Sequence, residues 1–150
     1  MDGIRNWTLG LAIAAATLAT GAPALAAGAE VTFVERATTD AISVHGGAAA
    51  DNVGDILTFA NEVFDAANAV KVGSDQGYCV RVVVGKSWEC FWTLILAEGQ
   101  ITVEGPFLDT GDSVMVVTGG TGKYAGAKGD MKLHSRDAKS TAYDFTYELL

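Results

Sequence analysis

The chain has 150 residues, of which 49% are hydrophobic and 19% charged, and its formal net charge is −8. This length suits a single domain with a core of its own and leaves little room for a second one. The excess of acidic residues argues against nucleic acid or an anionic membrane as a partner, because both repel a polyanion.

The first segment has the pattern of an export signal. Residues Asn6–Ala29 carry no charge, and within them Leu9–Ala19 forms a short apolar core. The run Ala24-Leu25-Ala26 supplies the small residues that a signal peptidase requires, so we predict cleavage after Ala26 and secretion of the mature chain. An uncleaved membrane anchor is the alternative. The predicted organisation is a signal peptide at 1–26 and one folded domain at 27–150.

Short runs rich in β-branched and aromatic residues, separated by turn residues, follow the leader. Eight of them indicate strands: Val31–Arg36, Asp55–Phe64, Tyr78–Val84, Glu89–Ala97, Gln100–Phe107, Asp112–Thr118, Ala127–His134 and Ala142–Leu149. Consecutive strands without covering helices predict an all-β domain, either a closed eight-stranded antiparallel barrel or a two-layer sandwich. We favour the barrel, because closure leaves no exposed edge and its interior can hold one small apolar ligand.

Two connecting segments differ from ordinary turns. Ala37–Val53 is longer than usual for a loop without secondary structure, which makes it a candidate functional segment. Val117–Gly129 contains five glycines between two strand-like runs, a composition typical of a tight hairpin turn. A phosphate-binding loop is the rival interpretation, but the segment lacks the required spacing before Gly-Lys and no helical pattern follows it.

The two cysteines, Cys79 and Cys90, are predicted to be free thiols. Export would allow a disulfide. If the turn between their strands lies at Gly85–Trp88, however, the partner of Cys90 is about four residues from Cys79, or roughly 13 Å. A disulfide spans Cα atoms no more than about 7 Å apart. The histidines His45 and His134 share no ligand spacing with the cysteines, so no metal site is predicted.

Four runs in order and at compatible spacing resemble plant allene oxide cyclase: Val53–Asn61, Gly77–Val80, Gly99–Leu108 and Val117–Tyr124. The last run also resembles the dirigent proteins of the same barrel superfamily. The resemblance implies an eight-stranded barrel, a homotrimer and an apolar cavity that opens at one end. It also implies an apolar small molecule as the partner. The cyclisation or stereochemistry of this molecule would be guided by confinement, without a metal or organic cofactor.

The resemblance further suggests which residues line the cavity. Asn61 matches an asparagine that helps to hold an ordered water, and Cys79 matches a cavity-lining cysteine. The family's essential glutamate lies in the first strand, three residues ahead of a Glu-Arg pair. Aligning that pair on Glu35-Arg36 places Thr32 at the glutamate position and Val34 at the neighbouring asparagine, so this alignment lacks the charged group that would stabilise a developing cation.

Arg81 shares strand parity with Cys79, and we hypothesise that its guanidinium receives a substrate carboxylate. The predicted substrate-binding residues are therefore Asn61, Cys79 and Arg81, and no catalytic residue is assigned. Two of them have a structural alternative: a buried thiol is more often plain core, and a buried amide can pin a turn or bulge within the barrel. The carboxylates of Asp55, Asp65 and Glu104 are expected to be solvated, without a catalytic role.

Alternation along the last strand requires Tyr143, Phe145 and Tyr147 to point the same way, either lining a cavity or packing a trimer contact. Two functions of different class remain open on the sequence. The first is a cyclase or stereochemical guide that confines a reactive molecule. The second is a non-catalytic barrel that binds a stable apolar ligand or serves as a structural or interaction module.

Overall fold

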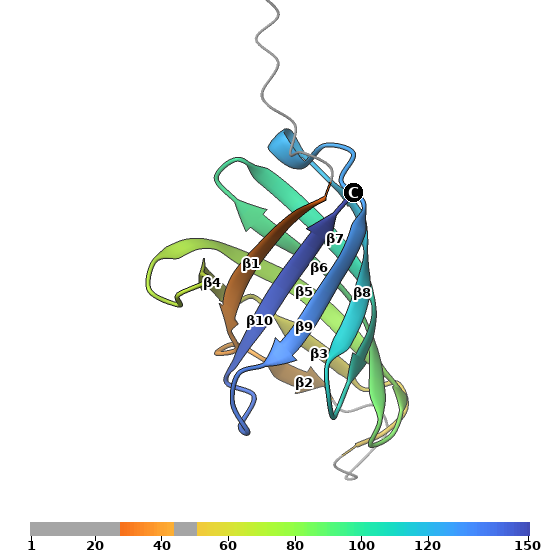
Figure 1. The fold of residues 1–150 in the computed structure, drawn as a ribbon. Helices are drawn as coiled ribbons and strands as arrows, with labels where there is room; N and C mark the ends of the chain where they lie inside the picture. Colours follow the sequence, from red (N-terminus) through yellow and green to blue (C-terminus); the bar gives the residue numbers. More distant parts are fainter. Residues whose placement is uncertain (1–27, 44–50) are drawn as a thin grey trace, which may run out of the picture.

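The computed structural model describes residues 28–43 and 51–150. The predicted signal peptide, its cleavage site and part of the segment 37–53 lie outside these residues. The elements, shown in Figure 1, are β1 (Ala29–Arg36), β2 (Ala41–Ser43), β3 (Ile56–Phe59), β4 (Glu62–Asp65), β5 (Lys71–Val83), β6 (Ser87–Leu96), β7 (Gly99–Leu108), β8 (Ser113–Gly120), the 3-10 helix η1 (Gly122–Tyr124), β9 (Gly129–Ser135) and β10 (Ala142–Leu149). None of the helical structure within the described ranges is long and apolar enough to cross a membrane.

The sheet closes on itself, because β5 pairs with β3 and β4 along one edge and with β6 along the other. β1 pairs with β4 and β2 pairs with β3, so β1 and β2 act as one broken strand, and β3 and β4 as another. The result is a closed eight-stranded antiparallel barrel (Figure 1). It confirms the predicted fold and excludes the sandwich.

The two broken strands are interrupted at the same height of the barrel. The sequence predicts one continuous strand over Asp55–Phe64, but Ala60 and Asn61 separate β3 from β4. Opposite them, residues 37–40 separate β1 from β2. The pairing register shifts by one residue across this gap, since Arg36 lies opposite Glu62 whereas Ala41 lies opposite Thr58. At the paired interruptions, backbone N–H and C=O groups of the barrel wall are free of the regular strand-to-strand hydrogen bonds and can bond to polar side chains instead.

The barrel interior is a packed aromatic and aliphatic core over most of its length. Inward residues alternate with outward ones, as the side-chain period of a strand requires. Tyr143, Phe145 and Tyr147 all point inward, and the last two are almost fully buried. The stripe predicted on the last strand therefore belongs to the interior of the barrel rather than to its outer face.

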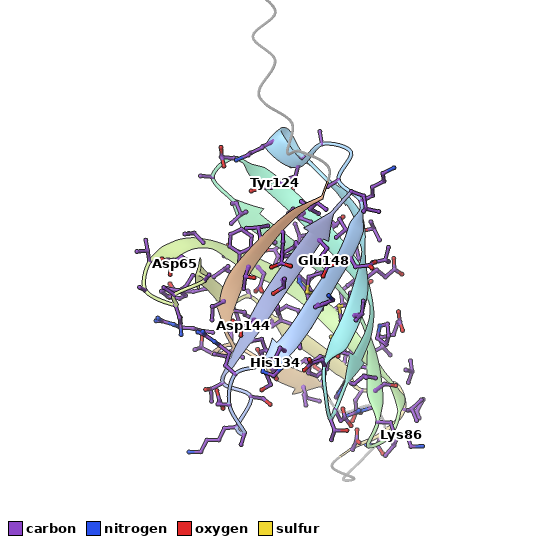
Figure 2. All side chains as sticks on the ribbon, in the orientation of Figure 1. Asp65, Lys86, Tyr124, His134, Asp144 and Glu148 are labelled. Atoms are coloured by element: carbon purple, nitrogen blue, oxygen red, sulfur yellow. A yellow bond between two sulfur atoms is a disulfide. The ribbon has the colours of Figure 1, made fainter. Side chains whose placement is uncertain are left out.

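The outer wall has two different characters. Across β9 and β10 it carries charged side chains, with ion pairs between Lys132 and Glu148 and between His134 and Asp112; Figure 2 shows Glu148 and His134 on this face. On β1, the outward Arg36 places its guanidinium 3.5 Å from the centre of the Phe64 ring and donates to Asn68. Such a contact shields an apolar ring that the outer surface would otherwise expose.

β5 begins seven residues earlier than the sequence predicts, at Lys71 instead of Tyr78. Its first half contains Gly73 and Gly77, which lower strand propensity and disguise the element. The structure shows why Gly77 is needed: a Cβ there would lie 2.3 Å from the Cβ of Trp92 and 2.4 Å from the carbonyl oxygen of Phe91. The close approach of β6 therefore requires a residue without a side chain.

The prediction of two free thiols is wrong, because Cys79 and Cys90 form a disulfide. A β-bulge at Val82 shifts the turn, so that Arg81 pairs with Trp88 and Cys79 lies directly opposite Cys90. Their Cα atoms are 4.0 Å apart. The error was the placement of the turn at Gly85–Trp88, which displaced the register by four residues and turned a cross-strand pair into a remote one.

Replacing both Cys79 and Cys90 with Ala is expected to lower the free energy of unfolding by about 2 to 3 kcal/mol. The disulfide closes a short loop across the β5–β6 hairpin and restricts the unfolded chain. Urea unfolding monitored by fluorescence measures this loss. A reductant should shift the midpoint of the parent protein to that of the double variant and leave the variant unchanged; a variant as stable as its parent would contradict the expectation.

The glycine-rich segment connects β8 and β9 as a hairpin, as predicted, but not through a tight turn. Residues 121–128 include η1, and Tyr124, labelled in Figure 2 near the upper end of the barrel, packs into the core. Part of the long segment 37–53 also has structure, because β2 adds to the sheet beside β3.

Candidate functional site

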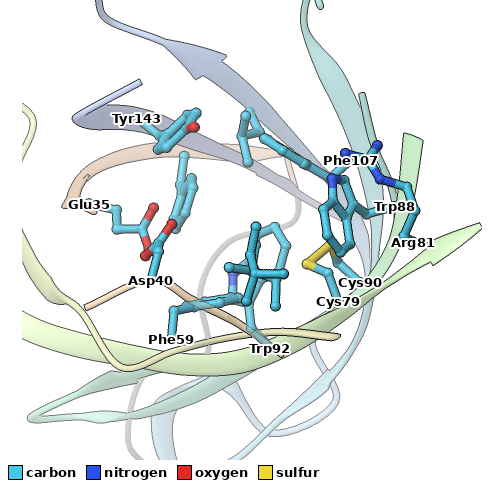
Figure 3. Close-up of a pocket in the computed structure, with 14 residues that line it drawn as sticks. Glu35, Asp40, Phe59, Cys79, Arg81, Trp88, Cys90, Trp92, Phe107 and Tyr143 are labelled. Atoms are coloured by element: carbon cyan, nitrogen blue, oxygen red, sulfur yellow. A yellow bond between two sulfur atoms is a disulfide. The ribbon is translucent and has the colours of Figure 1, made fainter. Parts of the chain in front are cut away.

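A cavity of about 320 Å³ opens at the end of the barrel that carries β2. Six aromatic side chains provide most of its wall, as Figure 3 shows in part: Phe59, Trp88, Trp92, Phe107, Tyr143 and Phe145. Several of these rings are in contact, with ring centres 5.3 Å apart for Trp92 and Phe145 and 5.9 Å apart for Phe107 and Tyr143. The volume and the mainly apolar lining are those of a small-molecule site.

Asn61 joins the two strand interruptions beside this cavity. Its Oδ1 accepts hydrogen bonds from the backbone N–H groups of Thr38 and Thr39, at 3.0 and 2.9 Å, and from the Thr39 hydroxyl at 2.9 Å. Its Nδ2 donates to Glu35 at 2.7 Å and to Asp40 at 2.9 Å. The amide thus uses its full bonding capacity to fix the segment 37–40 and to aim two carboxyl groups.

Glu35 and Asp75 form a buried pair of carboxyl groups. They are 5% and 1% exposed. The backbone N–H of Asn61 donates to Asp75 Oδ1 at 3.2 Å, whereas Asp75 Oδ2 is buried and receives no N–H or hydroxyl donor from the described residues. The Glu35 carboxyl is hydrogen-bonded to the Asp75 side chain. A protonated Glu35 supplies the donor that this pair requires.

The electrostatics of the pair agree with one shared proton. Burial, followed by the negative charge of Asp75, raises the pKa of Glu35 well above its ordinary value of 4.5. Burial also raises the pKa of Asp75, to about 7. Two carboxyl groups in contact inside a protein cannot both ionise at neutral pH, so they titrate as one unit that retains a proton.

Two tyrosines on β10 complete this side of the interior. The phenol of Tyr143 lines the cavity together with Glu35 and Asp40 (Figure 3), and burial raises its pKa. Tyr147 lies deeper, where burial and then the charge of Asp75 raise its pKa well above the ordinary value. Both phenols therefore remain neutral hydrogen-bonding groups beside the carboxyl pair.

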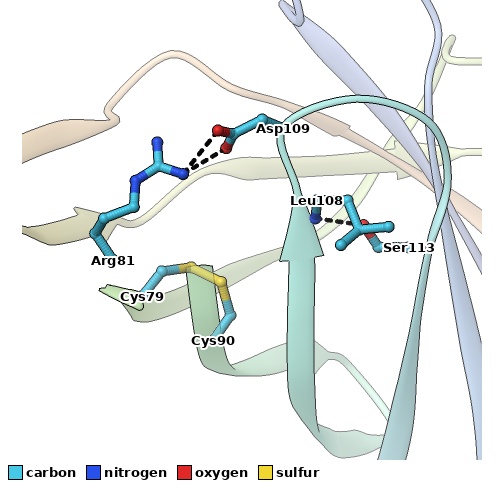
Figure 4. Close-up of a disulfide and its surroundings, with 6 residues drawn as sticks. All are labelled: Cys79, Arg81, Cys90, Leu108, Asp109 and Ser113. Atoms are coloured by element: carbon cyan, nitrogen blue, oxygen red, sulfur yellow. Dashed lines mark hydrogen bonds and ion pairs between the residues drawn. A yellow bond between two sulfur atoms is a disulfide. The ribbon is translucent and has the colours of Figure 1, made fainter. Parts of the chain in front are cut away.

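The opposite side of the cavity carries the disulfide and Arg81 (Figures 3 and 4). The Arg81 guanidinium makes two hydrogen bonds to Asp109, at 2.7 and 2.8 Å, and its Nε lies 2.7 Å from Asp51. It also stacks on Trp88, 4.0 Å from the ring centre. Two carboxylates thus already compensate its charge, and it ties the β7–β8 turn to the segment that precedes β3.

The structure brings two of the three predicted site residues to the cavity wall and places the third behind it. Cys79, as a disulfide, and Arg81 line the cavity, while Asn61 holds Glu35 and Asp40 from the wall. Asn61 thus combines the two roles that the sequence left open, since it pins an interruption of the barrel and bonds polar groups of the cavity.

The first-strand alignment is wrong. Thr32 faces outward, where its hydroxyl is 2.9 Å from that of Thr146, and Val34 faces outward opposite Phe64. Glu35 is the carboxyl group of β1 that lines the cavity. The charged group that the alignment reported as missing is therefore present, and strand parity would have found it, because Glu35 follows the same face as Val31 and Phe33.

Asp40 and Asp75 were also missed. Asp75 lies within the polar run of β5 that the sequence did not identify as a strand, and Asp40 lies in the segment 37–53. Across residues 28–43 and 51–150, no three His, Cys, Asp or Glu side chains are grouped so as to hold a metal ion. A second cavity of about 460 Å³ lies at the opposite end of the barrel, with Val31, Phe33 and Leu96 in its wall.

Comparison with known proteins gives one family and several similar folds. The family model described as allene oxide cyclase matches residues 28–143. A solved structure of a pyocyanin demethylase is 25% identical, with a TM-score of 0.69 over 81% of this chain and 100% of that one. An exo-specific intermolecular Diels–Alderase (16% identity, TM-score 0.63, 81% and 98% covered) and a pterocarpan synthase dirigent protein (12%, 0.66, 81% and 94%) share the fold.

The family match covers most of the chain and includes all strands from β1 to β9, so it agrees with the barrel topology and with the resemblance in the sequence. The dirigent protein and the Diels–Alderase among the similar structures have the same fold. The chain belongs to the allene oxide cyclase family.

Proposed function

We propose that the protein binds an apolar small molecule in the cavity beside β2 and guides its cyclisation or stereochemistry by confinement, with Glu35 as the proton donor. The observation that carries this proposal is the buried carboxyl group of Glu35, which lines an aromatic cavity of about 320 Å³ and whose pKa burial raises well above its ordinary value. A neutral acid in a dry, rigid pocket can both orient a flexible molecule and protonate it.

The residues present support a reaction that needs no second reactant. In the closure of an epoxy alcohol, Glu35 gives its proton to the epoxide oxygen as one C–O bond of that ring breaks. The hydroxyl oxygen of the same molecule bonds to the freed carbon, and the hydroxyl proton passes to the carboxylate. The product is an isomer of the substrate, and Asp75 keeps the recovered proton within the pair.

The similar proteins support a role in small-molecule chemistry without specifying it. Their names describe a demethylase, a Diels–Alderase and a dirigent protein, which are different activities on one fold. Fold alone does not determine function, so the cavity and its carboxyl pair are the features that support this proposal. The alternative is a barrel that binds a stable apolar ligand without converting it, for which the cavity alone would suffice.

Export and assembly are part of the proposal. The Cys79–Cys90 disulfide supports maturation in an oxidising compartment, as expected after cleavage behind Ala26. The outer face of β3, β5 and β6 supports a homotrimer contact, because Ile56 and Tyr78 are 43% and 50% exposed there. Native mass spectrometry of the protein from its own host would measure the mature mass, the subunit number and any bound small molecule.

Replacing Glu35 with Gln is expected to slow the reaction about 100-fold, because general acid catalysis contributes that much or more. The assay uses an aryl-substituted epoxy alcohol that can close to two cyclic ethers, with rate and product ratio measured by chiral chromatography. Glu35→Gln keeps the acceptor for Asn61 and should alter the affinity for the neutral probe N-phenylnaphthylamine less than about threefold.

Glu104→Gln is the matched control, since Glu104 is exposed on the outer face of β7. It should leave rate and product ratio unchanged. Full activity in Glu35→Gln would overturn the assignment of Glu35. Tight binding of the probe without any acceleration by the parent protein would instead establish the non-catalytic alternative.

A further inference from the structure

The charged groups around the cavity are distributed asymmetrically. Glu35 and Asp40 lie on one side, and Arg81 lies on the other, beside Trp88 (Figure 3). Glu35 is backed by Asp75, which adds a further carboxyl group behind the wall. Asn61 holds the carboxyl oxygens of Glu35 and Asp40 in place, at 2.7 and 2.9 Å from its Nδ2. Because the Glu35–Asp75 pair retains a proton, the carboxylate of Asp40 supplies most of the negative charge on this side of the cavity.

The opposite side does not offset this acidity. Arg81 is the only cationic side chain among the described residues that line the cavity. Its guanidinium already contacts two carboxylates, Asp51 and Asp109, so the three groups together carry a net negative charge. Its remaining face is stacked on Trp88. A carboxylate ligand that approaches Arg81 would have to enter this negative field.

Between the two sides lies a group of aromatic rings that presents π-faces and edges to the cavity. Phe59 packs edge-on against Trp92, which in turn contacts Phe145. Aromatic rings attract a cation through their negative faces, and the attraction grows when the site excludes water. Both the rings and the carboxyl groups therefore favour the same sign of charge in a ligand.

We infer that the cavity selects planar aromatic molecules that carry a positive charge and discriminates against carboxylates. The inference rests on the site of the proposed function and narrows its substrate class: a molecule that is cationic, or becomes cationic as it reacts, is stabilised between the rings and Asp40. It replaces the hypothesis that Arg81 receives a substrate carboxylate.

Three bicyclic probes of similar size test this inference by isothermal titration calorimetry: N-methylquinolinium, its neutral isostere α-methylnaphthalene, and α-naphthoate. N-methylquinolinium is expected to bind about tenfold more tightly than α-methylnaphthalene, on the scale of a desolvated cation–π contact. The α-naphthoate is expected to bind more weakly than either. Raised salt should reduce the preference for the cation, because part of it comes from charged groups near the cavity mouth.

Asp40→Asn tests whether the preference arises in this site. The side chain keeps an oxygen to accept from Asn61, so we expect the affinity for N-methylquinolinium to fall about threefold to fivefold and that for α-methylnaphthalene to change less than about twofold. Glu104→Gln removes the same charge from the outer face and should change neither affinity.

The inference would be overturned by equal affinities for the cation and its isostere, by tightest binding of α-naphthoate, or by equal losses in Asp40→Asn and Glu104→Gln. The second would restore the role of Arg81 as a carboxylate receptor. Absence of binding by all three probes would overturn it as well. These outcomes are independent of the epoxy alcohol assay, since a barrel that binds cations without turnover contradicts the proposed function and leaves the inference standing.

Discussion

Asn61→Ala is expected to lower the free energy of unfolding by about 3 kcal/mol, one of the two largest effects that we predict. The side chain is 1% exposed and makes five hydrogen bonds, two of them to carboxyl groups. Its removal leaves the N–H groups of Thr38 and Thr39 without an acceptor and Glu35 and Asp40 without their shared donor. Glu35 is buried and cannot regain a partner from water, so the loss of its donor costs about 1 to 3 kcal/mol, whereas the exposed groups of residues 38–40 lose their bonds at a smaller cost.

Urea unfolding followed by circular dichroism measures this loss as a shift of the midpoint at constant slope. Gln100→Ala is the control, because it removes an amide from the exposed outer face of β7 and should change the stability by less than about 0.5 kcal/mol. A loss below about 1 kcal/mol in Asn61→Ala would show that the two strand interruptions do not depend on this amide.

Asp75 is expected to make the protein less stable as the pH rises. Its pKa is about 7 in the folded protein against 3.8 for the free side chain, so the folded state holds a proton that the unfolded state releases between these values. The contribution is complete below about pH 4 and is lost as the pH rises through about 7. The expected decrease is roughly 4 kcal/mol, at 1.36 kcal/mol for each unit of pKa.

Asp75→Asn should remove most of this dependence. The amide can still accept from the Asn61 N–H and can donate to an ionised Glu35, so the variant is expected to be more stable than its parent at pH 8 and less stable or equal at pH 4. Unfolding curves in urea at the two pH values provide the comparison. Parallel pH profiles for parent and variant would contradict the assignment of the shared proton to this pair.

The strands from β6 to β10 could be predicted closely because each shows alternating residues between clear turn signals, so that the local sequence contains most of the information. Closure of the sheet into a barrel was predicted because the sequence indicates eight consecutive strands and no helices to cover an open sheet. The aromatic stripe at Tyr143, Phe145 and Tyr147 was also predicted as one face, and the structure settles that this face is the interior.

The register of β5 against β6 could not be predicted in the same way. Val80, Val82, Val83 and Val84 are all apolar, so the pattern does not reveal which residues face inward or where the bulge lies. The true turn follows from the bulge at Val82 and the glycine contact at Gly77. Both depend on how β5 and β6 approach each other in three dimensions. Because the register was predicted wrongly, the disulfide between Cys79 and Cys90 was not predicted either.

The carboxyl pair of Glu35 and Asp75 was not predicted from the sequence for a related reason. Glu35 was assigned through an ungapped alignment rather than through its own strand parity, and Asp75 lay in a glycine-containing run with weak strand propensity. The hydrogen bonds of Asn61 to both strand interruptions connect residues 35, 40 and 75, which are far apart in sequence. Such a cluster exists only once the barrel has closed.

The adjacency of Glu35 and Arg36 has a consequence for how this family can vary. One side chain reaches the lumen and the next covers Phe64 on the outside, so inserting or deleting a single residue earlier in β1 without a compensating bulge would exchange them. The lumen would then receive a permanent cation in place of an acid, and the outer wall would gain a carboxylate. We therefore expect that insertions and deletions are not tolerated within β1. They should be tolerated after residue 36, because the irregular segment 37–40 can change length without altering which side chains of β1 face the interior.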